Sequence, residues 1–175
     1  MKTKSIIYKL SVALLLLVFI AAGCGYKFSG GGTLPSGTGA ICIKIFENSS
    51  SETQLENTLT NDIIYEFTRN GQTVVRNEAS ADSVMIGRII SVSTESATRT
   101  TNLISVEKKV KVVIGVALQN RKGRILWENN ELKYEQTFLA KADDNEAEKS
   151  YKKAALVKLS KRFSAALYAN MTEDF

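Results

Sequence analysis

The thiol of Cys24 is the side chain whose surroundings most clearly indicate chemistry. It follows Ala21-Ala22-Gly23, and small residues directly before a cysteine are typical of the site at which exported bacterial chains are acylated on sulfur and then cut. An apolar run of thirteen residues, Leu10 to Ala22, ends there and is preceded by three lysines and no acidic residue. A membrane-spanning helix needs roughly 20 apolar residues, so this run is too short to remain in a bilayer. The pattern predicts a lipoprotein signal peptide over residues 1–23 and lipid attachment at Cys24.

Two positions beside this cysteine bear on its processing and sorting. Such sites usually hold Leu three places before the cysteine, and here Ala21 stands there, so an ordinary secretory signal is the alternative. Gly25 follows the cysteine in place of the Asp that retains lipoproteins at the inner membrane of many enteric bacteria. We therefore expect a lipid-anchored chain at the periplasmic face of the outer membrane.

The other residues that could do chemistry argue against an enzyme. The chain has no histidine, which removes the commonest general base and the commonest metal ligand. Asp143-Asp144 could act as a carboxylate pair, but adjacent acids before a helix are far more often caps. The triplet Gly30-Gly31-Gly32 lacks the Lys-Ser or Lys-Thr that completes a phosphate-binding loop. We expect no catalytic residue, no metal site and no cofactor.

The second cysteine, Cys42, has no partner within the chain once Cys24 carries lipid. No internal disulfide is then possible. A lone thiol could form an intermolecular link, but its place in the apolar stretch Ile41 to Phe46 favours a buried, inert cysteine on a strand.

Length and charge favour one domain and exclude a general nucleic-acid binder. The first 23 residues hold three of the 23 Lys and Arg and none of the 18 acids, so the net charge falls from +5 to +2 without them. The remaining 152 residues lie in the usual range of a single domain. A net charge this small gives no electrostatic footprint for nucleic acid.

A basic surface is nevertheless predicted on one side of a long strand. The alternation of residues 104–118 puts Lys109 and Lys111 opposite a row of apolar residues. Further positive charge is expected at strand ends and turns, from Arg99, Arg121, Lys122 and Arg124. These six residues are candidates for binding an anionic lipid or a partner, since charged side chains pair with phosphates. The alternative is a solvated sheet face without a specific ligand, and charge alone does not decide between the two.

Hydrophobic periodicity predicts the elements that position these residues. Residues 41–46 alternate as a strand, and Ser51-Glu52-Thr53-Gln54 has the pattern of a capping box before a helix that ends at Asn70-Gly71. A strand follows in which one face is expected to hold Val84, Ile86, Ile90 and Val92. The strand 104–118 is next, with Lys108 intruding on its apolar face.

The end of the chain completes this pattern. A strand from Arg124 to about Leu139, with an irregularity at Asn129-Asn130, leads to a helix that is acidic at its start. Its buried stripe is expected to be Ala155, Leu156, Leu159, Phe163, Ala166 and Leu167. The order predicts an α+β fold in which two helices pack on one face of a four-stranded mixed sheet. The first crossover should be parallel and right-handed, and the later strands an antiparallel meander. We expect a Gly-rich tether over residues 24–40 and a single domain over residues 41–175.

Several short patterns, in order, resemble one known family. They are Cys24-Gly25-Tyr26-x-Phe28-x-Gly30, then Leu34-Pro35, then Phe46-x-Asn48 before a helix, then Ala81-Asp82 leading to Gly87. Each is short, but their order and spacing resemble the lipopolysaccharide-assembly lipoproteins of the LptE family over essentially the whole chain after Cys24. The two-helix, four-strand order agrees with that resemblance.

The resemblance implies a non-enzymatic role. Members of the family plug a large outer-membrane β-barrel, help it assemble, and bind lipopolysaccharide on its way to the outer leaflet. The partners implied are this barrel, lipopolysaccharide and, through the lipid anchor, the membrane. One alternative is a lipoprotein scaffold or binding module of another cell-envelope assembly machine. The other is a small periplasmic enzyme that uses a carboxylate, against which the missing histidine counts.

Overall fold

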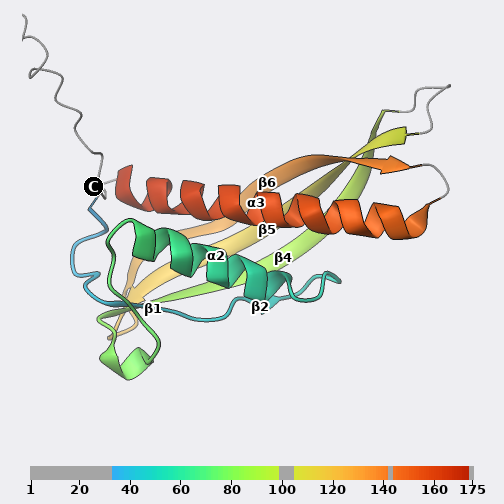
Figure 1. Ribbon diagram of the computed structural model, residues 1–175. Helices are drawn as coiled ribbons and strands as arrows, with labels where there is room; N and C mark the ends of the chain where they lie inside the picture. The colour runs from blue at the N-terminus through green and yellow to red at the C-terminus, as the bar shows by residue number, and fades with distance from the viewer. Residues whose placement is uncertain (1–32, 99–104, 142–143, 174–175) are drawn as a thin grey trace, which may run out of the picture. The chain divides into compact units, whose positions relative to one another are not determined.

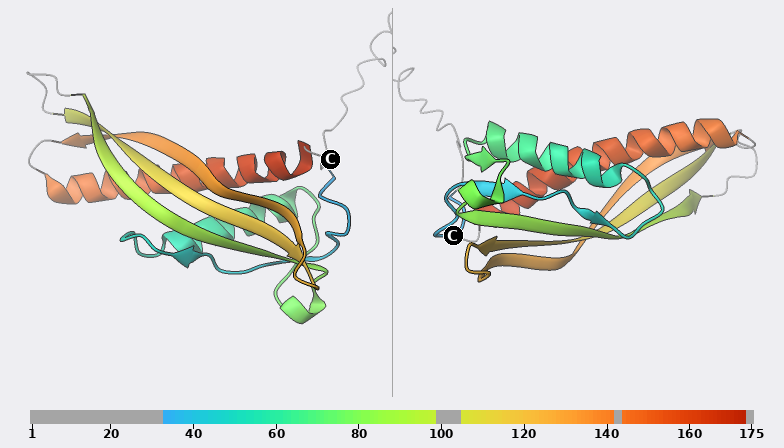
Figure 2. Two further views of the ribbon diagram at one scale, coloured as in Figure 1. Left: turned by 180° about the vertical axis from the view of Figure 1, so that it is seen from behind. Right: turned by 90° about the horizontal axis from the view of Figure 1, so that it is seen from below.

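The computed structural model describes residues 33–98, 105–141 and 144–173. These residues form a six-stranded mixed sheet in the order β3-β1-β4-β5-β6, with β2 paired to β4, and two α-helices that lie together on one face of it (Figure 1). The elements are β1 (Ile41–Ile43), β2 (Glu47–Asn48), α2 (Leu55–Arg69), β3 (Val74–Val75), the short 3-10 helix η1 (Glu78–Ser80), β4 (Ser83–Thr98), β5 (Ser105–Asn120), β6 (Ile125–Lys141) and α3 (Asn145–Glu173). Figure 2 shows the opposite face of the sheet free of helices.

The α+β class, the mixed sheet and the two helices agree with the prediction, but four strands were expected and the sheet has six. The strand predicted over residues 41–46 ends at Ile43, and Phe46 turns into the core, where it is 2% exposed and its backbone N–H donates to Thr60 Oγ1 of α2. The chain then rejoins β4 as β2. Strand β3 adds two more residues outside β1. Both additions are too short to show an alternation.

The strand directions follow the expected pattern. Strands β1 and β3 are parallel neighbours, and both β1 and β2 run parallel to β4. Strands β4, β5 and β6 form an antiparallel meander. Residues Val110, Val112, Ile114, Val116 and Leu118 of β5 are buried beneath the helices, as their alternation predicts.

The predicted inner face of β4 is wrong over its first half. Ile86 and Ile90 are 37% and 42% exposed, whereas Met85 and Ile89 are fully buried. The pairing with β5 shifts between Ile89 and Ser91, so Ile90 is an extra residue in a β-bulge. A bulge reverses which alternate residues face the core. A prediction that assumes one alternation for the whole strand is therefore wrong on one side of the bulge.

The predicted capping box at the start of α2 is also absent. Gln54 occupies the N-cap position in the left-handed region, at φ 68°, and provides no side-chain cap. The preceding loop is instead organised by Asn48, whose side chain accepts from the Ser50 backbone N–H (2.9 Å) and donates to Glu56 Oε2 (2.7 Å). The helix ends as predicted at Asn70-Gly71, with Gly71 at φ 82°.

Helix α3 begins and packs as its sequence predicts. Asp144 Oδ1 accepts from the Ala147 backbone N–H (2.9 Å), which is a helix cap; Asp143 lies outside the described residues. Five of the six predicted stripe residues are buried, and Ala166 is half-buried. Lys108, which intrudes on the apolar face of β5, extends to α3 and forms an ion pair with Glu148 (2.5 Å).

A small second cluster lies apart from the main core. Cys42, Ala81 and Val84 are buried together, and the Cys42 thiol contacts the Arg76 carbonyl oxygen (3.7 Å). Cys42 is thus a buried free cysteine on a strand, as predicted. Within the described residues, neither helix is long and apolar enough to span a membrane.

The described part of the predicted tether packs on the domain. Leu34 belongs to the main core, and Thr38 is buried, with its carbonyl oxygen accepting from Ser83 Oγ (2.7 Å). The Asp82 carboxylate accepts from the Ala40 backbone N–H (2.9 Å). These contacts attach residues 34–40 to the start of β4.

Candidate functional site

The predicted lysines of β5 lie on the helix-free face of the sheet, but both are ion-paired. Lys109 Nζ lies 2.9 Å from Glu135 Oε1 of β6, and Lys111 Nζ lies 2.7 Å from Glu95 Oε2 of β4. The strand register places Lys109 opposite Glu95 and Lys111 opposite Glu135, so the two ion pairs are the diagonal ones. The four residues therefore form one network across three strands.

This network stabilises the charged forms of Lys111 and Glu135. Hydrogen bonding to Glu95 raises the pKa of Lys111, and the nearby Glu135 carboxylate adds to the effect. Hydrogen bonding from Lys109 lowers the pKa of Glu135. An anion that binds these lysines must therefore compete with two carboxylates that are already in place.

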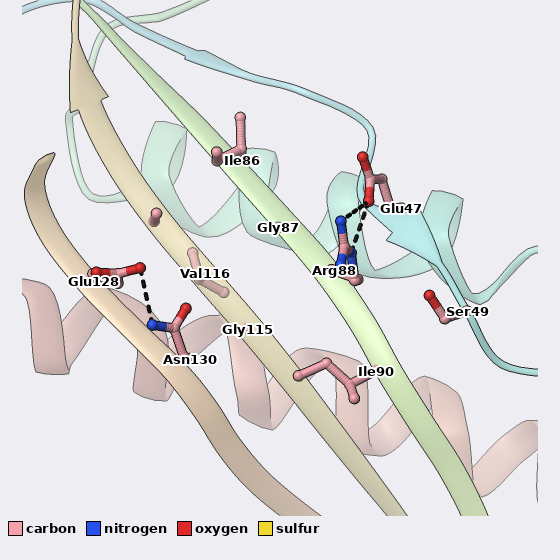
Figure 3. Close-up of a pocket in the computed structure, with 11 residues that line it drawn as sticks. Glu47, Ser49, Ile86, Gly87, Arg88, Ile90, Gly115, Val116, Glu128 and Asn130 are labelled. Carbon is pink, nitrogen blue, oxygen red and sulfur yellow. Dashed lines mark hydrogen bonds and ion pairs between the residues drawn. The ribbon is translucent and has the colours of Figure 1, made fainter. Parts of the chain in front are cut away.

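A shallow apolar trough lies further along the same face (Figure 3). It has a volume of about 590 Å³, and its lining includes Ile86, Ile90, Gly115 and Ala117. Arg88 stands at one side and is held by Glu47 of β2, with Nη2 and Oε2 2.7 Å apart. Sequence reasoning missed the trough because it placed the two isoleucines in the core. The small residues at alternate positions of β5 were the available signal.

The other predicted cations gather at the β5–β6 connection. Arg121, Lys122 and Arg124 line a concave surface of about 620 Å³ together with Asp82 and Asn120, and with Gly37 and Gly39 from the start of the described chain. The Arg121 Nε–H donates to the Ala81 carbonyl oxygen, and its guanidinium lies 3.5 Å from the Asp82 carboxylate. We call residues 121–124 the basic turn.

The structure thus divides the predicted site residues into two groups. Asn120, where β5 ends, is the ninth residue after Lys111, a distance of about 30 Å at the usual rise. The lysine network and the basic turn therefore belong to different surfaces. Arg99 and Cys24, the remaining predicted residues, lie outside the described part of the chain.

Nothing within the described residues points to a bound metal or an unpaired polar ligand. No group of three or more Cys, Asp or Glu is placed to hold a metal ion there. Every buried side-chain nitrogen and oxygen in that part of the chain has a hydrogen-bond partner. The candidate sites of the described domain are therefore the surfaces described above: the lysine network, the apolar trough and the basic turn.

The short patterns behind the family resemblance have structural roles. Phe46 packs against Gly87, where a side chain on the glycine would collide with the ring. Asn48 organises the loop before α2, and Asp82 links the segment before β1 to Arg121. These residues hold the edge of the sheet together.

Solved structures of three bacterial lipoproteins are similar to this chain. A minor lipoprotein from Acinetobacter baumannii aligns with a TM-score of 0.50 at 9% identity, covering 77% of this chain and 91% of that one. The rare lipoprotein B from Shewanella oneidensis is 17% identical, with a TM-score of 0.45 and coverage of 74% and 94%. Lipoprotein B from Nitrosomonas europaea is 14% identical, with a TM-score of 0.49 and coverage of 85% and 90%.

Comparison with protein families is more specific. No curated protein matches the chain significantly. The model of the family described as "LptE: Lipopolysaccharide-assembly" matches residues 38–174, which include every helix and strand of the described domain. That match spans well over half of the 175 residues, and the chain therefore belongs to the LptE family of lipopolysaccharide-assembly proteins.

Proposed function

We propose that this protein is an outer-membrane lipoprotein, attached through Cys24, that plugs a β-barrel lipopolysaccharide translocon, assists its assembly and binds lipopolysaccharide during delivery. The observation that carries the proposal is the family match over residues 38–174. The lipid attachment at Cys24, the outer-membrane location, the plug and the glycolipid binding all go beyond this match.

The surface of the described domain supports a role inside a polar lumen. A transmembrane barrel of this kind is polar on the inside, so its plug needs a hydrogen-bonding exterior around an apolar core of its own. The helix-free face meets that need with the Glu95, Lys109, Lys111 and Glu135 network. The helices and sheet enclose a core that includes Phe67, Phe163 and Ile114, all of them fully buried.

Lipopolysaccharide binding is assigned to the lysine network together with Arg99. Lysine is a compact charge that pairs with phosphates, and lipopolysaccharide carries phosphates. Displacement of Glu95 and Glu135 by a phosphate would leave Lys109 and Lys111 paired and release two carboxylates to water. In the proposed contact, the two lysines therefore exchange their carboxylate partners for a phosphate.

The test is to isolate the protein from its native envelope in mild detergent. We expect one large β-barrel protein to co-purify in a fixed ratio. Because a plug that binds only the folded barrel stabilises it by mass action, depletion of this protein should also lower the amount of correctly assembled barrel. Recovery of a different envelope complex, with barrel level and insertion unchanged on depletion, would favour a scaffold of another assembly machine.

A further inference from the structure

The basic turn is held by hydrogen bonds to the side chain and backbone of Asn120. The Asn120 side-chain oxygen accepts from the backbone N–H groups of Lys122 (2.9 Å) and Arg124 (3.0 Å). Gly123 adopts φ 76°, and the Asn120 N–H donates to the Arg124 carbonyl oxygen (2.9 Å). The three cationic side chains therefore extend from a fixed frame.

The turn also has an excess of positive charge that the domain does not neutralise. Among the described residues, Asp82 is the only acid that lines the concave surface with Arg121, Lys122 and Arg124, and it lies 3.5 Å from Arg121. The side chains of Lys122 and Arg124 are exposed and form no ion pair with any described residue. The lysine network differs in this respect, because there each lysine has a carboxylate within 3 Å.

The start of the described chain lies beside this turn. Gly37 and Gly39 line the same concave surface, and Asp82 binds both the Ala40 N–H and the Arg121 guanidinium. The basic turn therefore lies at the end of the sheet from which the chain leads back to Cys24.

Chain length limits how far this end can stand from an anchor at Cys24. Thr33 is the ninth residue after Cys24, and a fully extended chain of nine residue steps spans about 32 Å at most. Strand β5 has 16 residues and is about 53 Å long. If Cys24 is fixed in a bilayer, the tether keeps Thr33 within about 32 Å of the anchor, so the end of the sheet that carries the basic turn can reach the headgroups.

We propose that the basic turn docks on the anionic phospholipid headgroups of the leaflet that holds the anchor. Arg121, Lys122 and Arg124 would contact phosphates, and the β4–β5 end of the sheet would then point away from the membrane. Anchoring raises the local concentration of headgroups, so three surface cations suffice to orient a domain that they could not recruit alone. This inference rests on the lipid attachment at Cys24 proposed above, and it does not require the barrel.

The only tryptophan of the chain provides a natural probe of this contact. Trp127 is half-buried on β6, three residues after Arg124. We would reconstitute the full lipidated protein into vesicles of phosphatidylcholine alone, or of phosphatidylcholine with phosphatidylglycerol, each containing a headgroup-labelled fluorescence quencher. Quenching of Trp127 should be stronger in the anionic vesicles and should decline at high salt, because screening weakens exposed charge pairs.

Charge reversal at the turn gives the decisive comparison. Each cation near an anionic surface contributes roughly a fivefold bias, so Lys122→Glu with Arg124→Glu should lower the docked-to-undocked ratio about tenfold or more. The matched control is Lys158→Glu with Lys161→Glu, which makes the same charge change at exposed positions of α3. Urea unfolding of both variants checks that the domain remains folded.

Each outcome has a separate meaning. Equal quenching in neutral and anionic vesicles, or equal loss in the turn and control variants, would overturn leaflet docking. An intact mass without lipid would overturn the anchor instead. Co-purification of the barrel, measured in parallel, tests the plug, and its failure would leave the vesicle result unchanged.

Discussion

The ring of Phe46 lies directly over Gly87, so that a Cβ on the glycine would stand 2.2 Å from Cε2 of the ring. We expect Gly87→Ala to lower the free energy of unfolding by about 2–3 kcal/mol, because a rigid ring in a packed core cannot move aside cheaply. Urea denaturation measures the loss. Gly115→Ala is the graded control, since its nearest contact is the Asn130 carbonyl oxygen at 3.3 Å.

A double-mutant cycle isolates this contact. In a Phe46→Leu background the ring is absent, and Gly87→Ala should then cost much less than in the parent protein. Strict additivity of the two substitutions would show that the glycine is needed for some other reason.

The ion pair between Lys108 and Glu148 links β5 to the first turns of α3, and both side chains are about one-quarter exposed. Lys108→Met leaves a partly buried carboxylate without its partner and should cost about 1–2 kcal/mol, between surface and buried pairs. Adding Glu148→Leu should recover most of the loss, measured by thermal or urea unfolding. A double variant no more stable than Lys108→Met would contradict this explanation.

The loop before α2 should respond to acid. Hydrogen bonding from Asn48 lowers the pKa of Glu56 below its ordinary value of 4.5, so the stability it contributes is present above that pH and lost as pH falls through the lowered pKa. Asn48→Ala should raise the pKa of Glu56 towards 4.5 in an NMR titration. Ser50→Ala retains the contact between Asn48 and Glu56 and should leave that pKa nearly unchanged.

In the lysine network, removing the lysines and removing the glutamates should change lipopolysaccharide binding in opposite directions. Lys109→Gln with Lys111→Gln should weaken binding at least about tenfold, since each charge-assisted contact is worth about 1.5–3 kcal/mol. Glu95→Gln with Glu135→Gln removes the competing carboxylates and should strengthen binding. Neutral substitutions are preferable to Lys→Glu here, because added carboxylates would stand beside Glu95 and Glu135. Unchanged affinity in both pairs would mean that the face is only solvated.

The lipid at Cys24 can be checked by intact mass. We expect loss of residues 1–23 together with the added mass of the acyl chains, and Cys24→Ser should block both changes. A mature protein without lipid, or normal processing of Cys24→Ser, would favour the ordinary secretory signal.

Elements with an unbroken period were predictable from the sequence. The valines of β5 and the stripe around Leu159 and Phe163 keep one phase over their whole length, and both are buried as expected. The start of α2 was not predictable in detail. The sequence suggests a cap from Ser51, but the loop is held by the hydrogen bond from Asn48 to Glu56. The two ways of holding this loop have similar sequence patterns, and only the tertiary geometry distinguishes them.

The candidate site was predictable in its residue types but not in its pairing. Alternation places Lys109 and Lys111 on the helix-free face, which the structure bears out. Their carboxylate partners come from β4 and β6, and identifying them requires the strand register. That register depends on shifts at Ile90 and near Gly115, which no periodic pattern reveals.

The bulge at Ile90 acts on β4 much as a frameshift acts on a reading frame. Alternate side chains before it face the core in one phase, and those from Ser91 to Ser96 face it in the other phase. Deletion of Ile90 alone would direct Val92 towards solvent or Ile89 away from the helices. A compensating one-residue insertion further along the strand would limit the inverted stretch to the residues between the two changes. Length changes within this strand should therefore be tolerated in pairs, while single ones disrupt the core.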